Sequence, residues 1–334
     1  MYLTVYKKLK GTGFYKEQFK GDKVTLKLNP VDYKPTPEVK GAMLMARVVT
    51  WWSNGMDMPE DKASRYHAFQ IPKRNGKMRD IKEPIGSTKA IQRNICYKMK
   101  TELQILPHDC CHGFVKYRRC LTAMQKHQDN QSNWFLKLDI SNFFPSISKE
   151  LILNTFKLIP QFMYVDTDVR DWLADALTDE TGHLTQGCIS SPYIANLVLL
   201  EFDYKFSNWC RKNNLVYTRY ADDMCISSRV KFDKSAVVSK VKGLLPEGIN
   251  LNDEKTKMTS IAGENVFLGI HYNQNKDLTV GYKTKHLMKV MAHKADLGQV
   301  PDEERSLWKG RLIYYTSIEP LYFSNSRFDS LRRL

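Results

Sequence analysis

Two adjacent aspartates in the sequence have the residue type and the setting to bind a divalent cation. Asp222 and Asp223 lie between two apolar stretches, 215–220 and 224–228, which predict a pair of strands on either side of them. Two carboxylates side by side near a core repel each other, and this repulsion is costly unless a cation neutralises it. Mg²⁺ prefers oxygen ligands, carboxylates among them. The pair therefore predicts a magnesium site, although an aspartate pair taken alone also fits a solvated turn.

A third carboxylate, Asp139, stands 83 residues before Asp222 in the chain. The stretch WFLKLDI at 134–140 predicts a strand that ends near Asp139. The turn SNFFPSI then leads into a predicted helix with the sequence SKELILNTFKLI. A site that holds two metal ions needs about three carboxylates from separate elements. Asp139 supplies the third one.

The other predicted elements are a hairpin and several helices. The text AFQIPKRNGKMRDI at 68–81 predicts two short strands around an Asn-Gly turn. Apolar residues at helical spacing over 87–106 predict a helix that packs on the core. Ser190 and Ser191 predict a hydroxyl cap for a helix with Pro192 in its first turn. Strands interleaved with helices indicate an α+β or α/β core.

The chain is strongly basic, with 51 Lys and Arg against 36 Asp and Glu and a net charge of +15. Such a surface attracts polyanions, so nucleic acid is the expected partner, and a charge kept for solubility is the alternative. The longest apolar runs fall far short of the ~20 residues that a membrane helix needs. We therefore expect no membrane span.

Seven cysteines occur without a CxxC pair and without a secretory leader, which indicates reduced thiols and a cytoplasmic protein. Four residues lie close enough in sequence to suggest zinc: Cys110, Cys111, His112 and Cys120. They lack the usual paired spacing, so buried thiols are the alternative that the sequence favours.

Several strings in the chain resemble the successive palm motifs of reverse transcriptases, with the bacterial retron and group II intron branches nearest. The strings are LDISNFFPSI, QGCISSPYIANL, YTRYADDMCIS, LNDEKTKM and FLGI. IPKRNGKMRDIKEP and HGFVKYRRC are similar to fingers segments of the same enzymes, so the resemblance covers about 66–270. It implies an α+β right-hand polymerase. The expected parts are an extension of unassigned role at 1–64, fingers at 65–130, a palm at 131–270 and a short helical thumb at 271–334.

The resemblance also implies roles for single residues in the palm. Asp139 and Asp222 are expected to bind two Mg²⁺ ions, with Asp223 assisting and the backbone carbonyl of Ile140 as a further metal ligand. Lys255 matches the lysine that protonates the departing pyrophosphate.

Residues expected to bind the nucleotide come from the palm and the fingers. Phe144 occupies the position of the ring that excludes a ribose 2′ hydroxyl, and Gln186 and Gly187 are expected to lie against the incoming nucleotide. Lys73 and Arg79 match positions that grip the triphosphate.

Leu268 and Gly269 resemble the hairpin that supports the primer end. Two strings depart from the retron pattern. Retron enzymes usually carry an Asn-Ala pair and a histidine before the first palm motif, and of these only the histidine is present here, as His127. Phe267, Leu268 and Gly269 stand where retron enzymes tend to have Val-Thr-Gly, which is closer to the intron-type pattern.

The implied function is RNA-directed DNA synthesis with a noncoding RNA template, dNTPs and an RNA–DNA hybrid product, in bacterial anti-phage defence. The 65 residues after Gly269 leave room for a helical thumb but for no RNase H or endonuclease domain. One alternative is a template-independent or protein-primed polymerase of the same fold, and another is an RNA-binding scaffold without activity. An effector protein or a homo-oligomer remains open as a partner.

Overall fold

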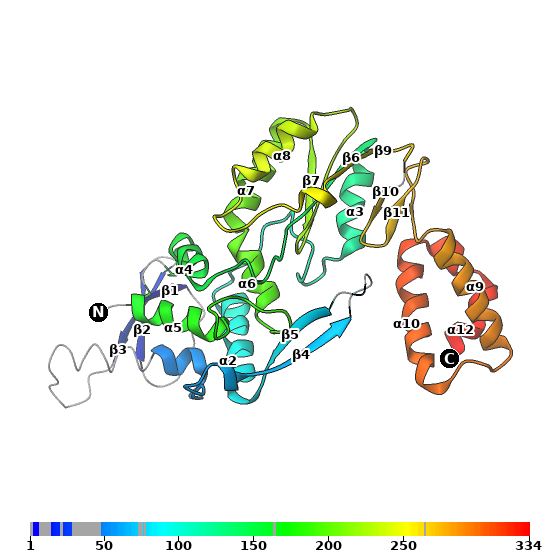
Figure 1. The fold of residues 1–334 in the computed structure, drawn as a ribbon. Helices are drawn as coiled ribbons and strands as arrows, with labels where there is room; N and C mark the ends of the chain where they lie inside the picture. Colours follow the sequence, from blue (N-terminus) through cyan, green and yellow to red (C-terminus); the bar gives the residue numbers. More distant parts are fainter. Residues whose placement is uncertain are drawn as a thin grey trace, which may run out of the picture. The chain divides into compact units, whose positions relative to one another are not determined.

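The computed structural model describes residues 3–6, 15–20, 23–28, 48–72, 76, 78–162, 165–263 and 265–334. The chain folds into two compact units, each made of three sequence segments (Figure 1). The first unit comprises Met1–Asp109, Ile140–Tyr204 and Leu244–Leu251. The second unit comprises Cys110–Asp139, Lys205–Gly243 and Asn252–Leu334.

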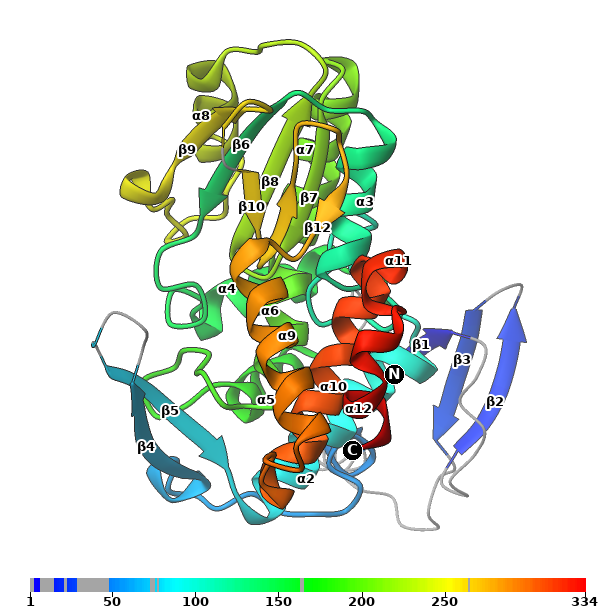
Figure 2. The same cartoon turned by 90° about the vertical axis from the view of Figure 1, so that its right-hand side faces the viewer.

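An antiparallel four-stranded sheet forms the centre of the second unit, with the strand order β7-β8-β6-β9. Its strands are β7 (Val216–Tyr220), β8 (Asp223–Ser228), β6 (Trp134–Asp139) and β9 (Lys257–Ser260). Figure 2 shows β8 between β6 and β7. The predicted strands that flank the three aspartates are therefore confirmed. Their apolar residues suit the inner strands because both faces of β6 and β8 are largely buried.

A second small sheet and the carboxyl-terminal helices complete the second unit. The sheet has the order β10-β11-β12 and consists of Asn265–Phe267, Ile270–Tyr272 and Leu278–Thr279. The helical segments are α3 (Cys120–Asp129), most of α7 (Leu200–Lys212), α8 (Lys234–Lys242), η4 (Asp253–Lys255), α9 (Tyr282–Asp296), α10 (Asp302–Ile318), α11 (Pro320–Phe323), η5 (Ser326–Phe328) and α12 (Asp329–Arg333). One hydrophobic cluster joins Phe135 of β6, Tyr272 of β11, Met288 of α9 and Phe328. The carboxyl-terminal segment is helical in α9 and α10, as expected for residues 271–334.

The first unit contains the predicted hairpin and a small amino-terminal sheet. The hairpin pairs β4 (Tyr66–Pro72) with β5 (Met78–Pro84), and Gly76 in its turn has φ 78°. Gly76 thus has the left-handed conformation that a glycine adopts without steric cost. The amino-terminal sheet has the order β1-β3-β2, with strands Leu3–Tyr6, Lys23–Leu28 and Tyr15–Lys20.

Helices make up most of the remaining first unit: a helical segment at 48–53, η1 (Ala63–Arg65), α2 (Gly86–Tyr97), η2 (Lys98–Glu102), α4 (Lys149–Leu158), η3 (Pro160–Phe162), α5 (Thr167–Leu177) and α6 (Ser191–Val198). The apolar residues predicted to pack on the core are buried, namely Ile91, Ile95, Met99 and Leu103. Ser148 caps α4 as its position suggests, because its hydroxyl accepts a hydrogen bond from the backbone of Leu151. In the described part of the chain, no helix combines the length and the apolar character that a membrane crossing requires.

Two details of the predicted helices were wrong. The helix at 87–106 is α-helical only as far as Tyr97 and continues as the π-helical turn η2. The expected hydroxyl cap of α6 is absent because Ser190 already has helical backbone angles. Its buried hydroxyl instead donates to the side-chain oxygen of Gln92 at 3.1 Å. Helix α6 ends at Val198, and α7 begins after a break at Leu199.

Candidate active site

The sheet of the second unit brings the three aspartates to one place. Asp139 ends β6 and pairs in register with Asp223, the first residue of β8. Asp222 lies in the turn between β7 and β8, directly after Ala221, which has the left-handed φ of 55°. The backbone carbonyl of Asp139 accepts a hydrogen bond from the backbone N–H of Asn252 at 2.7 Å, which fixes the end of β6. The two separate sequence motifs therefore meet at one end of the sheet.

Lys255, which the sequence motifs assign to the site, lies beside Asp139. Its Nζ donates to both carboxylate oxygens of Asp139, at 2.8 and 2.9 Å. The hydrogen bond to Asp139 is the main reason that the pKa of Lys255 is raised. Asp139 is 8% exposed, so the ammonium neutralises a carboxylate that is largely withdrawn from water.

Asp223 shows that the aspartates form a region of excess negative charge. Burial, followed by the carboxylates of Asp222 and Asp139, raises the pKa of Asp223 to about 7, and Lys255 only partly opposes this. A carboxyl group that resists ionisation for these reasons is stabilised in its charged form by a cation. The donor chemistry therefore fits Mg²⁺, which prefers carboxylate oxygens.

In the arrangement of the described side chains, no group of three or more His, Cys, Asp or Glu residues is close enough to enclose a metal ion. The ammonium of Lys255 occupies the oxygens of Asp139 that a cation would need. A cation that binds these oxygens would therefore compete with Lys255 for Asp139. Ile140, expected to supply a carbonyl ligand, belongs to the first unit, where it is buried and forms a bridge with Leu251.

The residues that suggested zinc make other contacts. Cys110 and Cys111 are buried, and the Sγ of Cys111 lies 3.6 Å from the carbonyl oxygen of Gly113. The Nδ1 of His112 shares a hydrogen bond with the hydroxyl of Thr122 at 2.7 Å. These contacts describe a packed segment of chain beside the sheet.

The residues expected to bind the nucleotide belong to the first unit. Phe144 is half-buried, whereas its neighbour Phe143 is only 4% exposed and serves the core. Phe144 is therefore the more accessible of the two residues. Arg79 is exposed on β5, and Lys73 lies outside the described residues.

Gln186 and Gly187 lie against the base of the β4–β5 hairpin. The backbone carbonyl of Gln186 accepts a hydrogen bond from the N–H of Lys82 at 2.8 Å. Gly187 has φ 106°, and a Cβ there would lie 2.7 Å from the Cγ2 of Ile81 and 2.9 Å from the carbonyl oxygen of Lys82. Only glycine permits this approach. The loop at 185–188 is thus fixed to the hairpin that carries Arg79.

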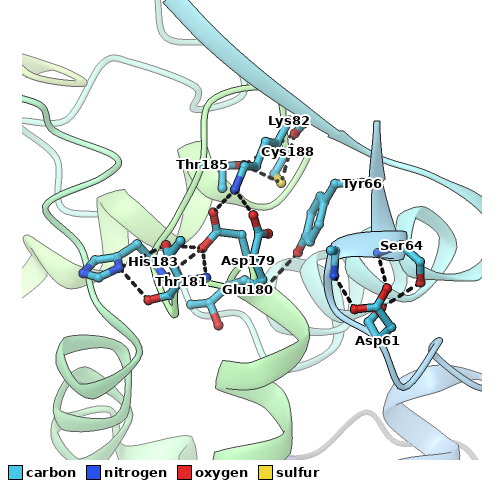
Figure 3. A network of polar contacts seen from close by, with 12 residues as sticks. Asp61, Ser64, Tyr66, Lys82, Asp179, Glu180, Thr181, His183, Thr185 and Cys188 are labelled. Carbon is cyan, nitrogen blue, oxygen red and sulfur yellow. Dashed lines mark hydrogen bonds and ion pairs between the residues drawn. The ribbon is translucent and has the colours of Figure 1, made fainter. Parts of the chain in front are cut away.

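Figure 3 shows an ion-pair network at the same place, which sequence reasoning missed. The ammonium of Lys82 binds Asp179 at 2.6 Å and Glu180 at 2.5 Å. Burial raises the pKa of Asp179, but hydrogen bonds from Lys82, Thr181 and the backbone of His183 outweigh burial and hold that pKa below its usual value. The adjacent acidic residues shortly before the Gln-Gly pair were the available signal in the sequence.

Leu268 and Gly269 form the turn between β10 and β11 in the second unit, with φ values of 53° and 80°. Two left-handed residues make a tight hairpin turn of the kind that favours glycine at its second position. Leu268 also packs against the hydrophobic cluster of that unit. The expected primer-supporting residues therefore sit on a well-formed hairpin.

Comparison with known proteins gives a consistent match. Residues 71–272 match the family "Reverse transcriptase (RNA-dependent DNA polymerase)". The retron Ec83 reverse transcriptase of Escherichia coli is 28% identical over 276 residues, which cover 78% of this chain and 85% of the relative. The retron Ec73 enzyme of the same species is 26% identical, with coverage of 77% and 84%. The retron Mx65 enzyme of Myxococcus xanthus is 25% identical, with coverage of 78% of this chain and 63% of the relative.

Proposed function

The chain belongs to the reverse transcriptase family, and we propose that Asp139, Asp222 and Asp223 are the metal ligands with which it copies RNA into DNA. It is an RNA-directed DNA polymerase of the retron type. Enzymes of this family use divalent metal ions. The observation that supports this assignment of the site is the register of β6 with β8, which sets Asp139 opposite Asp223 and next to the turn that carries Asp222.

Each aspartate has a defined task in the proposed mechanism. Two bound Mg²⁺ ions would supply activation of the primer 3′ hydroxyl and neutralisation of charge on the transferring phosphoryl group. Asp139 and Asp222 would hold these ions, and Asp223 would add charge in a partly buried setting where electrostatic attraction is strong. Lys255 keeps Asp139 neutralised before metal and nucleotide bind. Once it leaves Asp139, its ammonium is the group that donates a proton to pyrophosphate.

The proposed nucleotide contacts come from the first unit. Phe144 excludes a ribose 2′ hydroxyl, and Gln186 and Gly187 line the position of the incoming dNTP. Arg79 on β5, together with Lys73, grips the triphosphate through charge-assisted hydrogen bonds. The exposure of Arg79 and the half-buried ring of Phe144 support these roles.

We propose a structured noncoding RNA as the template and bacterial anti-phage defence, in the cytoplasm, as the setting. The net charge of +15 supports an RNA partner, because phosphate contacts by Lys and Arg supply most of such affinity. The relatives compared above are named retron reverse transcriptases, which supports a retron-like system. The division into fingers at 65–130, palm at 131–270 and thumb at 271–334 is part of the same proposal.

Primer extension on a defined RNA template tests the proposed site. We expect Asp222→Asn to reduce nucleotide incorporation by at least ~10³-fold, because loss of a metal ligand removes several kcal/mol of transition-state stabilisation. Asp129→Asn is the matched control, since Asp129 is exposed at the end of α3. Parental extension by a folded Asp222→Asn enzyme would contradict the assignment. Sequencing of the product distinguishes templated synthesis from untemplated addition.

A further inference from the structure

The segment Cys110–Gly113 lies along β7, an edge strand of the sheet. β7 leads into the turn of Ala221 and Asp222, which we call the catalytic turn. The backbone N–H of Arg219 donates to the carbonyl of Cys110 at 2.8 Å, and the N–H of His112 donates to the carbonyl of Arg219 at 2.7 Å. Cys111 and Arg219 form a parallel bridge. The segment therefore adds a short strand to the open edge of β7, just before Ala221.

Gly113 then brings its backbone into direct contact with the turn. A Cβ at this position would lie 2.6 Å from the backbone nitrogen of Ala221 and 3.1 Å from the carbonyl carbon of Tyr220. Both neighbours are backbone atoms, so no side chain can rotate away to make room. Any residue larger than glycine must therefore shift either the segment Cys110–Gly113 or the turn that carries Asp222.

The buried side chain of Arg219 contacts the same turn from the interior of the second unit. Its side chain is 0% exposed, and Nη1 donates to the carbonyl oxygen of Ala221 at 2.9 Å. Ala221 has a left-handed φ of 55°, which costs a residue with a side chain some free energy. The guanidinium of Arg219 therefore fixes the carbonyl of Ala221, the residue directly before Asp222.

Two further contacts fix the segment itself. Arg118 donates from Nη1 to the carbonyl of Cys111 at 2.8 Å. His112 shares a hydrogen bond with Thr122, which lies in the first turn of α3. The segment is thereby tied to its own loop and to a helix of the second unit, so it can act as a fixed support.

We propose that Gly113 and Arg219 are positioning residues that set the catalytic turn and so define where the carboxylates of Asp222 and Asp223 stand. Neither residue touches the reacting atoms. Their effect passes through the backbone of Ala221, one residue before the proposed metal ligand. The proposal rests on the proposed role of Asp222 and Asp223, because a turn without ligands would need no such precision.

Gly113→Ala tests the steric contact, with Gly310→Ala of α10 as the matched control because a Cβ there meets nothing within 4 Å. We expect kcat for single-nucleotide incorporation to fall about 10²-fold, as for a displacement of roughly 1 Å at a catalytic group. The KM for dNTP should change less than about threefold, since the nucleotide contacts are elsewhere.

Binding of Mn²⁺ to the free enzyme, followed by electron paramagnetic resonance, gives a readout that does not depend on turnover. We expect Gly113→Ala to weaken Mn²⁺ binding about tenfold, within the range found when the supports of metal ligands are changed. The Gly310→Ala control should bind Mn²⁺ like the parent. Parental Mn²⁺ affinity and parental kcat per folded Gly113→Ala molecule would overturn the proposal, whatever happens to the melting temperature.

Arg219→Lys provides a second, milder variant should Gly113→Ala fail to fold. Lysine keeps the charge but lacks the planar fork that reaches the Ala221 carbonyl, so we expect weaker Mn²⁺ binding and a lower kcat in the folded protein. Unchanged values in folded Arg219→Lys would refute the positioning role of Arg219. Asp222→Asn distinguishes a failure of the proposed metal ligands from a failure of the positioning proposal. If it binds Mn²⁺ like the parent, the proposed metal ligands are wrong; if it loses Mn²⁺ while Gly113→Ala and Arg219→Lys do not, only the positioning proposal fails.

Discussion

The catalytic turn of the second unit and the Gln-Gly loop of the first unit are held in different ways. In both, a glycine allows two backbones to touch, Gly113 on Ala221 and Gly187 on Lys82. The polar support differs. The turn is held by Arg219, whose side chain is 0% exposed, whereas the loop lies on the backbone of Lys82, whose side chain is 24% exposed and forms ion pairs with Asp179 and Glu180.

This difference corresponds to the different tasks proposed for the two regions. Metal ligands must stand within a fraction of an ångström of their productive positions in every cycle. A loop that admits and releases nucleotides needs a firm backbone but tolerates polar contacts that water can reach. We therefore expect changes in the turn to affect kcat and metal binding, and changes around the loop to affect the use of nucleotides.

Gly187→Ala should give the largest effect in the loop. The new Cβ would meet Ile81 and the carbonyl of Lys82, and φ of 106° is unfavourable for alanine. We expect kcat/KM for dNTP to fall about 10²-fold, with Mn²⁺ binding unchanged. Gly298→Ala is the control, because Gly298 also has positive φ, 67°, but has open space around it. A loss of Mn²⁺ affinity in Gly187→Ala would show that the two regions are not separable.

Phe144→Ala should change which nucleotide is used. Removal of the ring opens space for a ribose 2′ hydroxyl, so we expect discrimination between dCTP and rCTP to fall at least about tenfold, while dCTP incorporation declines modestly. Phe143→Leu serves as the comparison, because Phe143 is buried and should affect stability alone. An unchanged dCTP/rCTP ratio in Phe144→Ala would assign the exclusion of ribonucleotides to another residue.

Lys82→Met should have a smaller effect on the same loop. It leaves Asp179, whose side chain is 5% exposed, without its ammonium partner, and the loss of such a contact costs about 1–3 kcal/mol. We expect a lower melting temperature and a KM for dNTP raised about three- to tenfold. Lys89→Met removes a more exposed ion pair with Glu83 and should do neither. If KM stays at the parental value, the network stabilises the fold without positioning the loop.

His127 should give the smallest effect, visible in the pH dependence of stability. It is fully buried, its ring nitrogens contact Ser227 at 2.6 Å and Thr218 at 2.8 Å, and burial lowers its pKa to about 3. Because the unfolded chain binds this proton near pH 6.5 and the folded chain does not, the contribution is complete above pH 6.5 and is lost as pH falls towards 3.

Urea unfolding between pH 4 and pH 7 measures this contribution. We expect His127→Asn to flatten the slope of unfolding free energy against pH by up to about 1.4 kcal/mol per pH unit. His293→Asn, an exposed change on α9, should leave the slope as in the parent. The same slope in His127→Asn and parent would mean that His127 takes up its proton without unfolding.

Sequence patterns predicted strands β4 to β8 and helices α2, α4 and α6, because these depend on local alternation of apolar and polar residues. They also indicated Asp139 and the Asp222–Asp223 pair, since a charge pair between apolar strands demands an explanation. The supports of these residues could not be predicted. Gly113 meets Ala221, and Lys82 meets Asp179, only because the folded chain brings distant segments together.

The expected cap at Ser190 was wrong for the same reason, since the hydroxyl found a distant acceptor in Gln92 instead of the backbone of its own helix. Such residues have no local signature. A glycine in a loop or an arginine in a strand acquires its role from the partner that folding places beside it.

Anomalous diffraction from crystals of the enzyme with Mn²⁺, an RNA template annealed to a DNA primer, and an incoming dNTP tests the central claim most directly. We expect two Mn²⁺ peaks about 3.5–4 Å apart, both within coordination distance of carboxylate oxygens of Asp139 and Asp222, with Lys255 turned away from Asp139. Peaks bound elsewhere, or an Asp139 still paired with Lys255 in the complete complex, would contradict it.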